Sequence, residues 1–183
     1  LSLFKDANGR QLEGLVVKLG DLIRSDFPGG LSLPPASIVL KGGVYRLPGA
    51  NHHSNPFFLA HANGQSIIEE DEKKTGLHIS QSVAFSNVVS GRFYPARDVD
   101  SFKFPLKKGT DYQLDLFSQR LGFNTHPYVT TQIVNVSNDG EELPGPVKEF
   151  YESKENPGGR EFNMANRDIT WRFQAKTDGY LRV

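Results

Sequence analysis

Short runs of alternating or apolar residues, each bounded by Gly, Pro or Asn, recur along this chain and constrain its fold more than any other feature. The clearest run is DYQLDLFS (111–118), in which Tyr112, Leu114 and Leu116 alternate with polar residues. Because successive side chains of a strand point to opposite faces of a sheet, this alternation predicts a strand with one buried face. No long amphipathic helix accompanies these runs, which disfavours folds with crossover helices and predicts an all-β protein.

Turn residues divide the chain into strands of similar length. Asn-Gly at 8–9, Gly-Gly at 42–43 and Asn-Asp-Gly at 138–140 are each predicted to form a turn, because these residues readily adopt the positive φ angles of tight hairpins. Regularly spaced short strands are typical of a jelly-roll-like β-sandwich. We expect strands in the segments 1–19, 36–49, 55–62, 87–94, 100–106, 111–118, 128–137, 169–175 and 179–183, the two earliest as hairpins. The segment 147–156 is either a short helix or a strand, and we favour the strand.

The polar, turn-rich stretch NGQSIIEEDEKKTG (63–76) is the best candidate for a boundary between two β segments. We interpret residues 1–63 as the end of a preceding, smaller all-β segment, and residues 64–183 as the β-sandwich. The chain stops on DGYLRV, within an apparent strand, so we expect the sandwich to be truncated at its C-terminal end.

Aromatic and aliphatic residues at period-2 spacing predict the core. Residues on the inner faces of two packed sheets should be mostly buried; these are Phe102, Phe104, Leu114, Leu116, Trp171 and Phe173. Three tyrosines leave two alternatives open, because Tyr supplies rigid amphipathic contact area but also packs in cores. Tyr94, Tyr128 and Tyr151 either form a binding face or are packing and scattered surface residues.

Charge and composition argue against several classes of function. The 21 basic and 21 acidic residues cancel, so no nucleic acid or anionic membrane is expected as a partner. No apolar run approaches the roughly 20 residues that span a bilayer, and membrane insertion is not expected. The absence of Cys rules out thiol catalysis and Cys-ligated metals, and the five His lack the spacing of a zinc site. Neither a nucleophile elbow nor a P-loop is present, so we do not expect an enzyme.

Four motifs in order carry a family resemblance: EEDEKKT (69–75), SGRFYPARDVDSFKF (90–104), KKGTDYQLDLFS (107–118) and RFQAKTDGYLRV (172–183). Together they resemble the bacterial pre-peptidase C-terminal domain, a secreted β-sandwich related to the collagen-binding domains of clostridial collagenases. The resemblance begins near Ser66 and covers about 118 residues. The segments 45–62, 118–129 and 156–173 are similar to the form of this module in large exported proteins of planctomycete bacteria.

The resemblance implies a location outside the cell or in the cell envelope, and a non-catalytic accessory or adhesion module of a larger exported protein. Its implied partners are an extracellular protein or polysaccharide and the other domains of the parent chain. Two alternatives remain open: a carbohydrate-binding module, and a non-catalytic part of an exported hydrolase.

The resemblance also implies a calcium site, whose ligands by motif would be Glu69, Asp71, Asp98 and Asp100. The Pro-Asn part of the family motif is replaced here by residues that include Lys73 and Lys74. A lysine has no acceptor atom and cannot ligate calcium, but its ammonium can pair with the same carboxylates. Three alternatives therefore stay open: a working calcium site, a degenerate site in which Lys73 or Lys74 replaces the ion, and a plain solvated linker. No other cofactor is expected.

Overall fold

The computed structural model describes residues 33, 35–46, 54–61, 64–69, 80–91, 99–123, 125–137, 139–151, 156 and 158–183. Within these ranges the chain is mostly β, as predicted, and its two 3₁₀ helices are short. No helix in the described part is long and apolar enough to cross a membrane. The elements are η2 (Pro35–Val39), β1 (Gly42–Tyr45), β2 (Phe57–Ala60), β3 (Ser66–Ile68), β4 (Gln81–Ser82), β5 (Val88–Ser90), β6 (Phe102–Leu106), β7 (Asp111–Leu116), η4 (Gln119–Leu121), β8 (Val129–Val136), β9 (Glu142–Phe150), β10 (Ile169–Gln174) and β11 (Gly179–Arg182).

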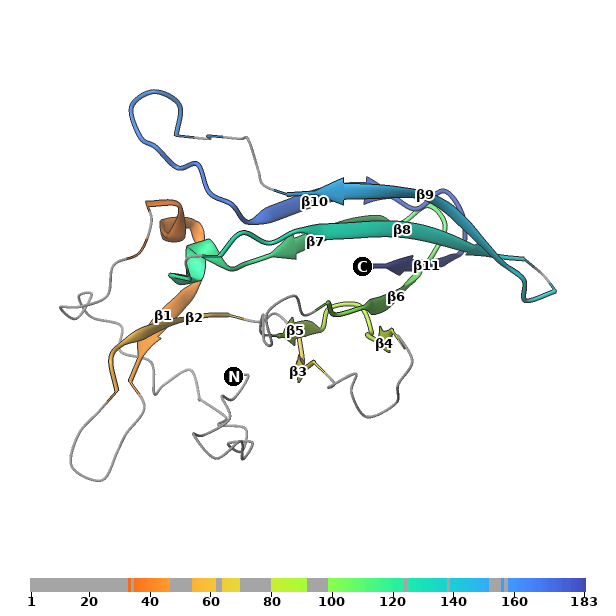
Figure 1. Cartoon of the computed structure of the whole chain (residues 1–183), viewed down its shortest axis with the longest axis horizontal. Coiled ribbons are helices and arrows are strands. Elements are labelled where there is room, and N and C mark those ends of the chain that lie inside the picture. The colour runs from red at the N-terminus through yellow and green to blue at the C-terminus, as the bar shows by residue number, and fades with distance from the viewer. Residues whose placement is uncertain are drawn as a thin grey trace.

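The largest sheet has five strands in the order β4-β6-β11-β8-β9. Strand β4 runs parallel to β6, and the other neighbours are antiparallel. The central strand β11 sets the register, because Leu181 lies beside Phe104 on one side and Ile133 on the other. Figure 1 shows the β8–β9 hairpin extending well past the other strands. The longest strands among the described residues therefore form one outer part of this sheet.

Three two-stranded sheets complete the described fold: β10-β7, β1-β2 and β3-β5, of which only the last is parallel. In the β10-β7 pair, Trp171 lies opposite Leu114 and Phe173 lies opposite Tyr112. This register places the apolar residues of both alternating runs on one face, as the period-2 pattern predicts.

The core lies where the β10-β7 pair meets the five-stranded sheet. Its buried centre is Leu106, Ala175 and Leu181. Side chains from both sheets pack against this centre, namely Phe104, Tyr112, Ile133, Trp171, Phe173 and Val183. Apolar side chains of the two sheets thus share one cluster, which removes them from water together.

Three of the six predicted core residues pack against the core cluster, and all six are partly buried. Phe104, Trp171 and Phe173 pack against the core cluster, yet each is only partly buried, and so are the other three predicted residues. One reason is visible at Trp171, whose ring lies 5.3 Å from that of Phe150. The Lys148 ammonium lies 4.8 Å from the Trp171 ring centroid. A hydrated cation covers this end of the core instead of an apolar side chain, so the rings stay partly in contact with water.

The predicted hairpin turn at Gly42-Gly43 is wrong. Both glycines lie within β1, which pairs with β2, while the preceding residues form η2. A Cβ on Gly42 would lie 2.1 Å from the carbonyl oxygen of Leu59, so the glycine is required by a close approach of two strands and not by a turn. The predicted turn at Asn8-Gly9 lies outside the described residues.

The predicted turn near Gly140 is confirmed. Gly140 has a φ of 80°, and its N–H donates to the carbonyl oxygen of Ser137 over 3.0 Å. The strand after it begins at Glu142, five residues before the predicted start at 147, and passes through Pro144 and Pro146. The Gln132 side chain compensates locally by donating to the carbonyl oxygen of Gly145 over 2.9 Å, beside an irregularity in the β8–β9 register.

The β1–β2 hairpin contacts the rest of the fold through the corner between β7 and β8. Both β2 and η2 lie against η4, and Ser37 Oγ donates to the carbonyl oxygen of Arg120 over 2.7 Å. The boundary expected between residues 63 and 64 stays a prediction, as does the truncation of the sandwich.

Candidate functional site

Two of the four predicted calcium ligands lie in the described part of the chain. Glu69 directly follows β3, and its N–H donates to the carbonyl oxygen of Ser90 over 3.1 Å. Its carboxylate lies so close to Gly91 that a Cβ there would be 2.4 Å from Oε2. Asp100 is half-buried just before β6. Within the described ranges, no three His, Asp or Glu side chains come together as metal ligands.

The other residues of that hypothesis, Asp71, Lys73, Lys74 and Asp98, lie outside the described residues. The three alternatives for this segment therefore stay predictions. Tyr94 also lies outside the described residues.

A buried carboxylate that the sequence analysis missed closes the corner between β7 and β8. Asp168 is 1 % exposed and accepts hydrogen bonds from the backbone N–H groups of Ser118 (2.9 Å) and Gln119 (2.7 Å). It also accepts from the backbone N–H of Arg120 (3.3 Å) and from Arg120 Nε (2.7 Å). The backbone donors are N–H groups at the start of η4, which have no partner within that helix, and Arg120 is the counter-ion of the carboxylate. Asp168 therefore has a structural role. Below, the term Asp168 corner means Asp168 with residues 118–120.

A charged cluster on the five-stranded sheet was also missed. Glu142 lies 3.6 Å from Lys103 Nζ and 3.6 Å from an Arg182 nitrogen. Arg182 also donates to the hydroxyl of Tyr180 over 2.9 Å and to Gln132 Oε1 over 3.2 Å. The hydrogen bond with Tyr180, followed by the charges of Lys103 and Arg182, lowers the pKa of Glu142. The groups of this cluster satisfy one another across four strands, which favours a role in holding the sheet together.

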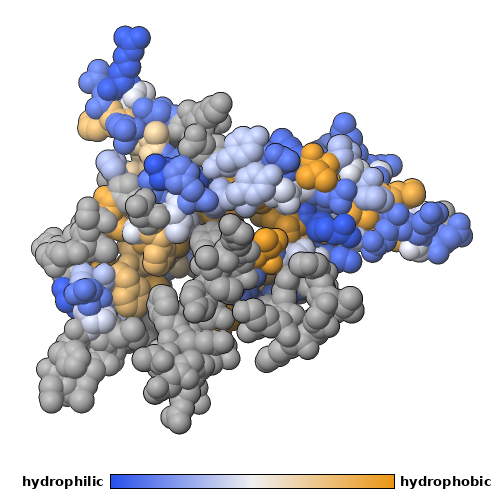
Figure 2. Space-filling model, viewed as in Figure 1, coloured by the Kyte–Doolittle hydropathy of each residue, from blue (hydrophilic) through white to orange (hydrophobic). Residues whose placement is uncertain are grey.

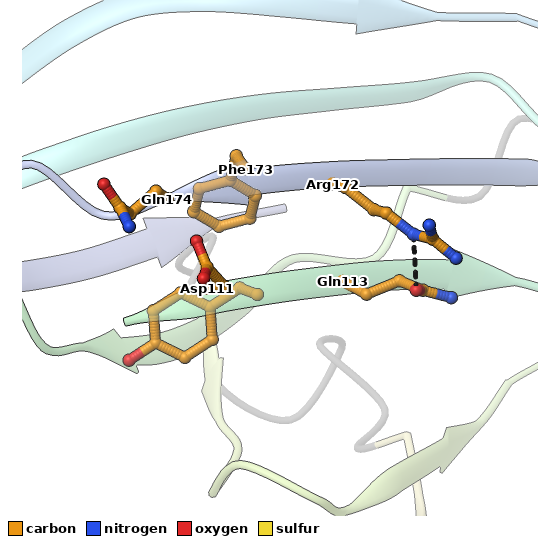
Figure 3. A pocket seen from close by; sticks show the side chains of 6 residues that line it. Asp111, Gln113, Arg172, Phe173 and Gln174 are labelled. Carbon is orange, nitrogen blue, oxygen red and sulfur yellow. Dashed lines mark hydrogen bonds between the residues drawn. The ribbon is translucent and has the colours of Figure 1, made fainter. Parts of the chain in front are cut away.

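A hollow of ≈ 510 Å³ lies over the β10-β7 pair (Figure 3). Its lining is Asp111, Tyr112, Gln113, Arg172, Phe173 and Gln174. Arg172 Nε donates to Gln113 Oε1 over 2.8 Å, as Figure 3 shows, and the Gln113 amide donates to Asp115 over 2.6 Å. Arg172 and Gln113 bond to each other across the strand pair, so these polar groups are satisfied within the fold.

The two described tyrosines of the predicted binding face do come together. Tyr128 precedes β8 and Tyr151 follows β9, one step beyond the pair formed by Val129 and Phe150. Their ring centroids are 5.8 Å apart and the ring planes differ by 13°. They are 57 % and 59 % exposed. Below, these two residues are named the tyrosine pair.

An acidic side chain, that of Glu149, lies beside Tyr128 in the tyrosine pair. Partial desolvation, together with the charge of Glu149 and a hydrogen bond to it, raises the pKa of the Tyr128 hydroxyl. The Tyr128 hydroxyl donates this hydrogen bond to the Glu149 carboxylate. Both rings stay more than half exposed, so their aromatic area is open to a ligand.

No protein-family model, no curated protein and no solved structure matches this chain. The resemblance to the pre-peptidase C-terminal domain therefore still rests on the motifs quoted above.

Proposed function

We propose that this chain is a non-catalytic accessory module of a larger exported protein, and that it attaches the protein to extracellular polymer through the tyrosine pair. In this proposal the β10-β7 pair and the five-stranded sheet are the two layers of a jelly-roll-like β-sandwich. The shared core of Leu106, Ala175 and Leu181, with side chains from both sheets around it, supports that architecture.

The tyrosine pair is the observation that carries the proposal. Two large aromatic rings, more than half exposed and packed against each other, lie directly beside the start of β8 and the end of β9. Large aromatic side chains that stay exposed are typical of interaction surfaces. Tyr is enriched there because it offers contact area at low entropic cost. Figure 2 shows that hydrophilic residues cover most of the described surface in view, with smaller apolar patches between them. Such a surface suits reversible contact with a hydrated polymer.

The same observation favours a second candidate function, that of a carbohydrate-binding module. Aromatic side chains exposed on a β-sheet can stack against the apolar faces of sugar rings. An adhesion module for protein and a carbohydrate-binding module differ in ligand and not in the residues that make contact.

Attachment to insoluble extracellular matrix from bacterial biofilm tests the proposal directly. The purified chain should sediment with the matrix, and the double variant Tyr128→Ala/Tyr151→Ala should remain in the supernatant. Phe162→Ala is the matched control, because Phe162 is 71 % exposed and lies outside the tyrosine pair. If the double variant sediments as well as the unchanged chain, the tyrosine pair does not mediate attachment and the proposal fails.

A further inference from the structure

The rigid setting of the tyrosine pair distinguishes it from scattered surface aromatics. Next to Tyr128 in sequence, Pro127 is fully buried and Val129 is 8 % exposed, so the backbone on both sides of this tyrosine is fixed in the fold. Tyr151 follows Phe150, whose ring packs on Trp171 at 5.3 Å. The two rings are parallel within 13° and each restricts the other. A ligand that contacts them does not have to order a flexible side chain first, which lowers the cost of binding.

Polar groups lie on the same face as the rings. Thr130 pairs with Glu149 in the β8–β9 ladder, and each is two residues from one tyrosine of the pair. Because side chains two residues apart on a strand share a face, Tyr128, Thr130, Glu149 and Tyr151 form one exposed patch. We call these four residues the tyrosine patch.

From this arrangement we infer that the tyrosine patch is a binding site for a neutral polysaccharide. The inference rests on the proposed function and names the class of ligand for the same site. A pyranose ring offers a flat face of C–H groups that can lie on an aromatic ring, with hydroxyl groups at its rim. The tyrosine patch offers the complement: two parallel rings, and beside them the Thr130 hydroxyl and the Glu149 carboxylate as hydrogen-bonding groups.

The charge of the tyrosine patch selects among polysaccharides. Glu149 is its one ionised group, and it accepts hydrogen bonds without donating any. It would repel the carboxylates or sulfates of an acidic polymer, whereas the hydroxyl groups of a neutral sugar can donate to it. The basic residue next in sequence, Lys148, instead lies over the rings of Phe150 and Trp171. An acidic polysaccharide is therefore the wrong partner for this face.

Native gel electrophoresis through soluble polysaccharides tests the inference with the whole 183-residue chain. The probes are hydroxyethylcellulose, galactomannan and mixed-linkage β-glucan as neutral polymers, and alginate as the acidic polymer. We expect at least one neutral polymer to retard the chain and alginate to leave it unretarded. Tyr151→Ala should raise the dissociation constant obtained from the retardation by about tenfold or more, as expected for an aromatic anchor. Phe162→Ala should leave this constant unchanged. Retardation by alginate alone, or by none of the four polymers, would overturn the inference.

Two further variants separate binding from folding. Tyr151→Phe keeps the ring and should retain most of the retardation, whereas Glu149→Gln removes the charge and should allow retardation by alginate to emerge. Circular dichroism of each variant must match the unchanged chain. If Tyr151→Ala binds as tightly as the unchanged chain while remaining folded, the tyrosine patch is not the site.

The matrix assay distinguishes failure of this inference from failure of the proposed function. If sedimentation depends on the tyrosine pair but is abolished by prior protease treatment of the matrix, and neutral polysaccharides do not compete, the module attaches to protein. The proposed function would then stand and the ligand class named here would be wrong. Competition by a neutral polysaccharide, with no effect of protease, is the result expected for the inference.

Discussion

Replacing Asp168 by Ala removes the acceptor at the centre of the Asp168 corner, and we expect a large loss of stability. The carboxylate is 1 % exposed and bonds to three backbone N–H groups and to Arg120 Nε. The Arg120 side chain is itself only 12 % exposed, so it would lose its counter-ion in a place that water reaches poorly. Removing one partner of a buried pair typically costs about 3–5 kcal/mol.

The expected loss of stability is smaller than the sum of the separate hydrogen bonds. Bonds to charged groups contribute about 1.5–3 kcal/mol each, but the four bonds share one carboxylate, so their separate contributions do not add. A loss of about 3–5 kcal/mol lowers the Tm of a chain of this size by roughly 6–20 °C, at about 2–4 °C per kcal/mol. Asp168→Asn should lie between the unchanged chain and Asp168→Ala, because its amide oxygen can still accept from the backbone.

Urea unfolding followed by circular dichroism and by the fluorescence of Trp171 measures the loss. Asp178→Ala is the matched control, because Asp178 is exposed and accepts one bond, from the Lys108 N–H over 2.8 Å. Because this carboxylate is exposed to water, its loss should be at most about 1.5 kcal/mol, the lower end of the range for bonds to charged groups. If Asp168→Ala costs no more than Asp178→Ala, burial and the ion pair do not stabilise this corner, and the reasoning is refuted.

Three further predictions follow from individual contacts. Melting curves in millimolar calcium and in chelator should nearly coincide if a lysine replaces the ion; an upward shift with calcium, lost in Asp100→Ala, would instead show a working site, worth about 2.7 kcal/mol at 100 times the dissociation constant. The pKa of Glu142 is lowered below its ordinary value of 4.5, so its contribution to stability is present above that pH and is lost as pH falls through the folded pKa; urea midpoints of Glu142→Gln should therefore change less on acidification than those of the unchanged chain. Trp171→Ala should cost less than the about 3–5 kcal/mol of a fully buried ring, and emission from Trp171 should lie between that of a dry and of a fully wetted indole.

Local pattern was sufficient to predict most of the described strands. The alternation in 111–118 and 169–175 predicted β7 and β10, and it placed Trp171 and Phe173 on the packed face. The Gly-Gly pair at 42–43 led to the wrong prediction of a turn. Glycine permits both a positive φ in a turn and a close approach of two backbones, and sequence alone does not distinguish these uses. The early start of β9 was missed because two prolines argue against a strand, although edge strands tolerate them.

The candidate site was predictable only in part, because its contacts join residues distant in sequence. Tyr128 and Tyr151 could be named as possible members of a binding face, but their stacking depends on the β8–β9 register. Asp168 gave no signal, since its four donors lie 48–50 residues earlier in the chain. A charge before a strand is ordinarily a solvated residue, and only the folded corner removes this one from water.

The segment that begins at Ser118 in the Asp168 corner leads to Tyr128 of the tyrosine pair. This connection links the stability of the corner to the proposed binding. Asp168 fixes Ser118, the Ser118 hydroxyl bonds to that of Thr125, and the buried Pro127 leads directly to Tyr128. Tyr151 instead reaches the pair from β9, through the core contact of Phe150. Binding to a ring whose backbone is already fixed loses little conformational entropy. A more mobile backbone next to Tyr128 should therefore weaken binding even where the fold is retained. Asp168→Asn, assayed well below its Tm, would then bind less tightly than the unchanged chain although every residue of the tyrosine patch is intact.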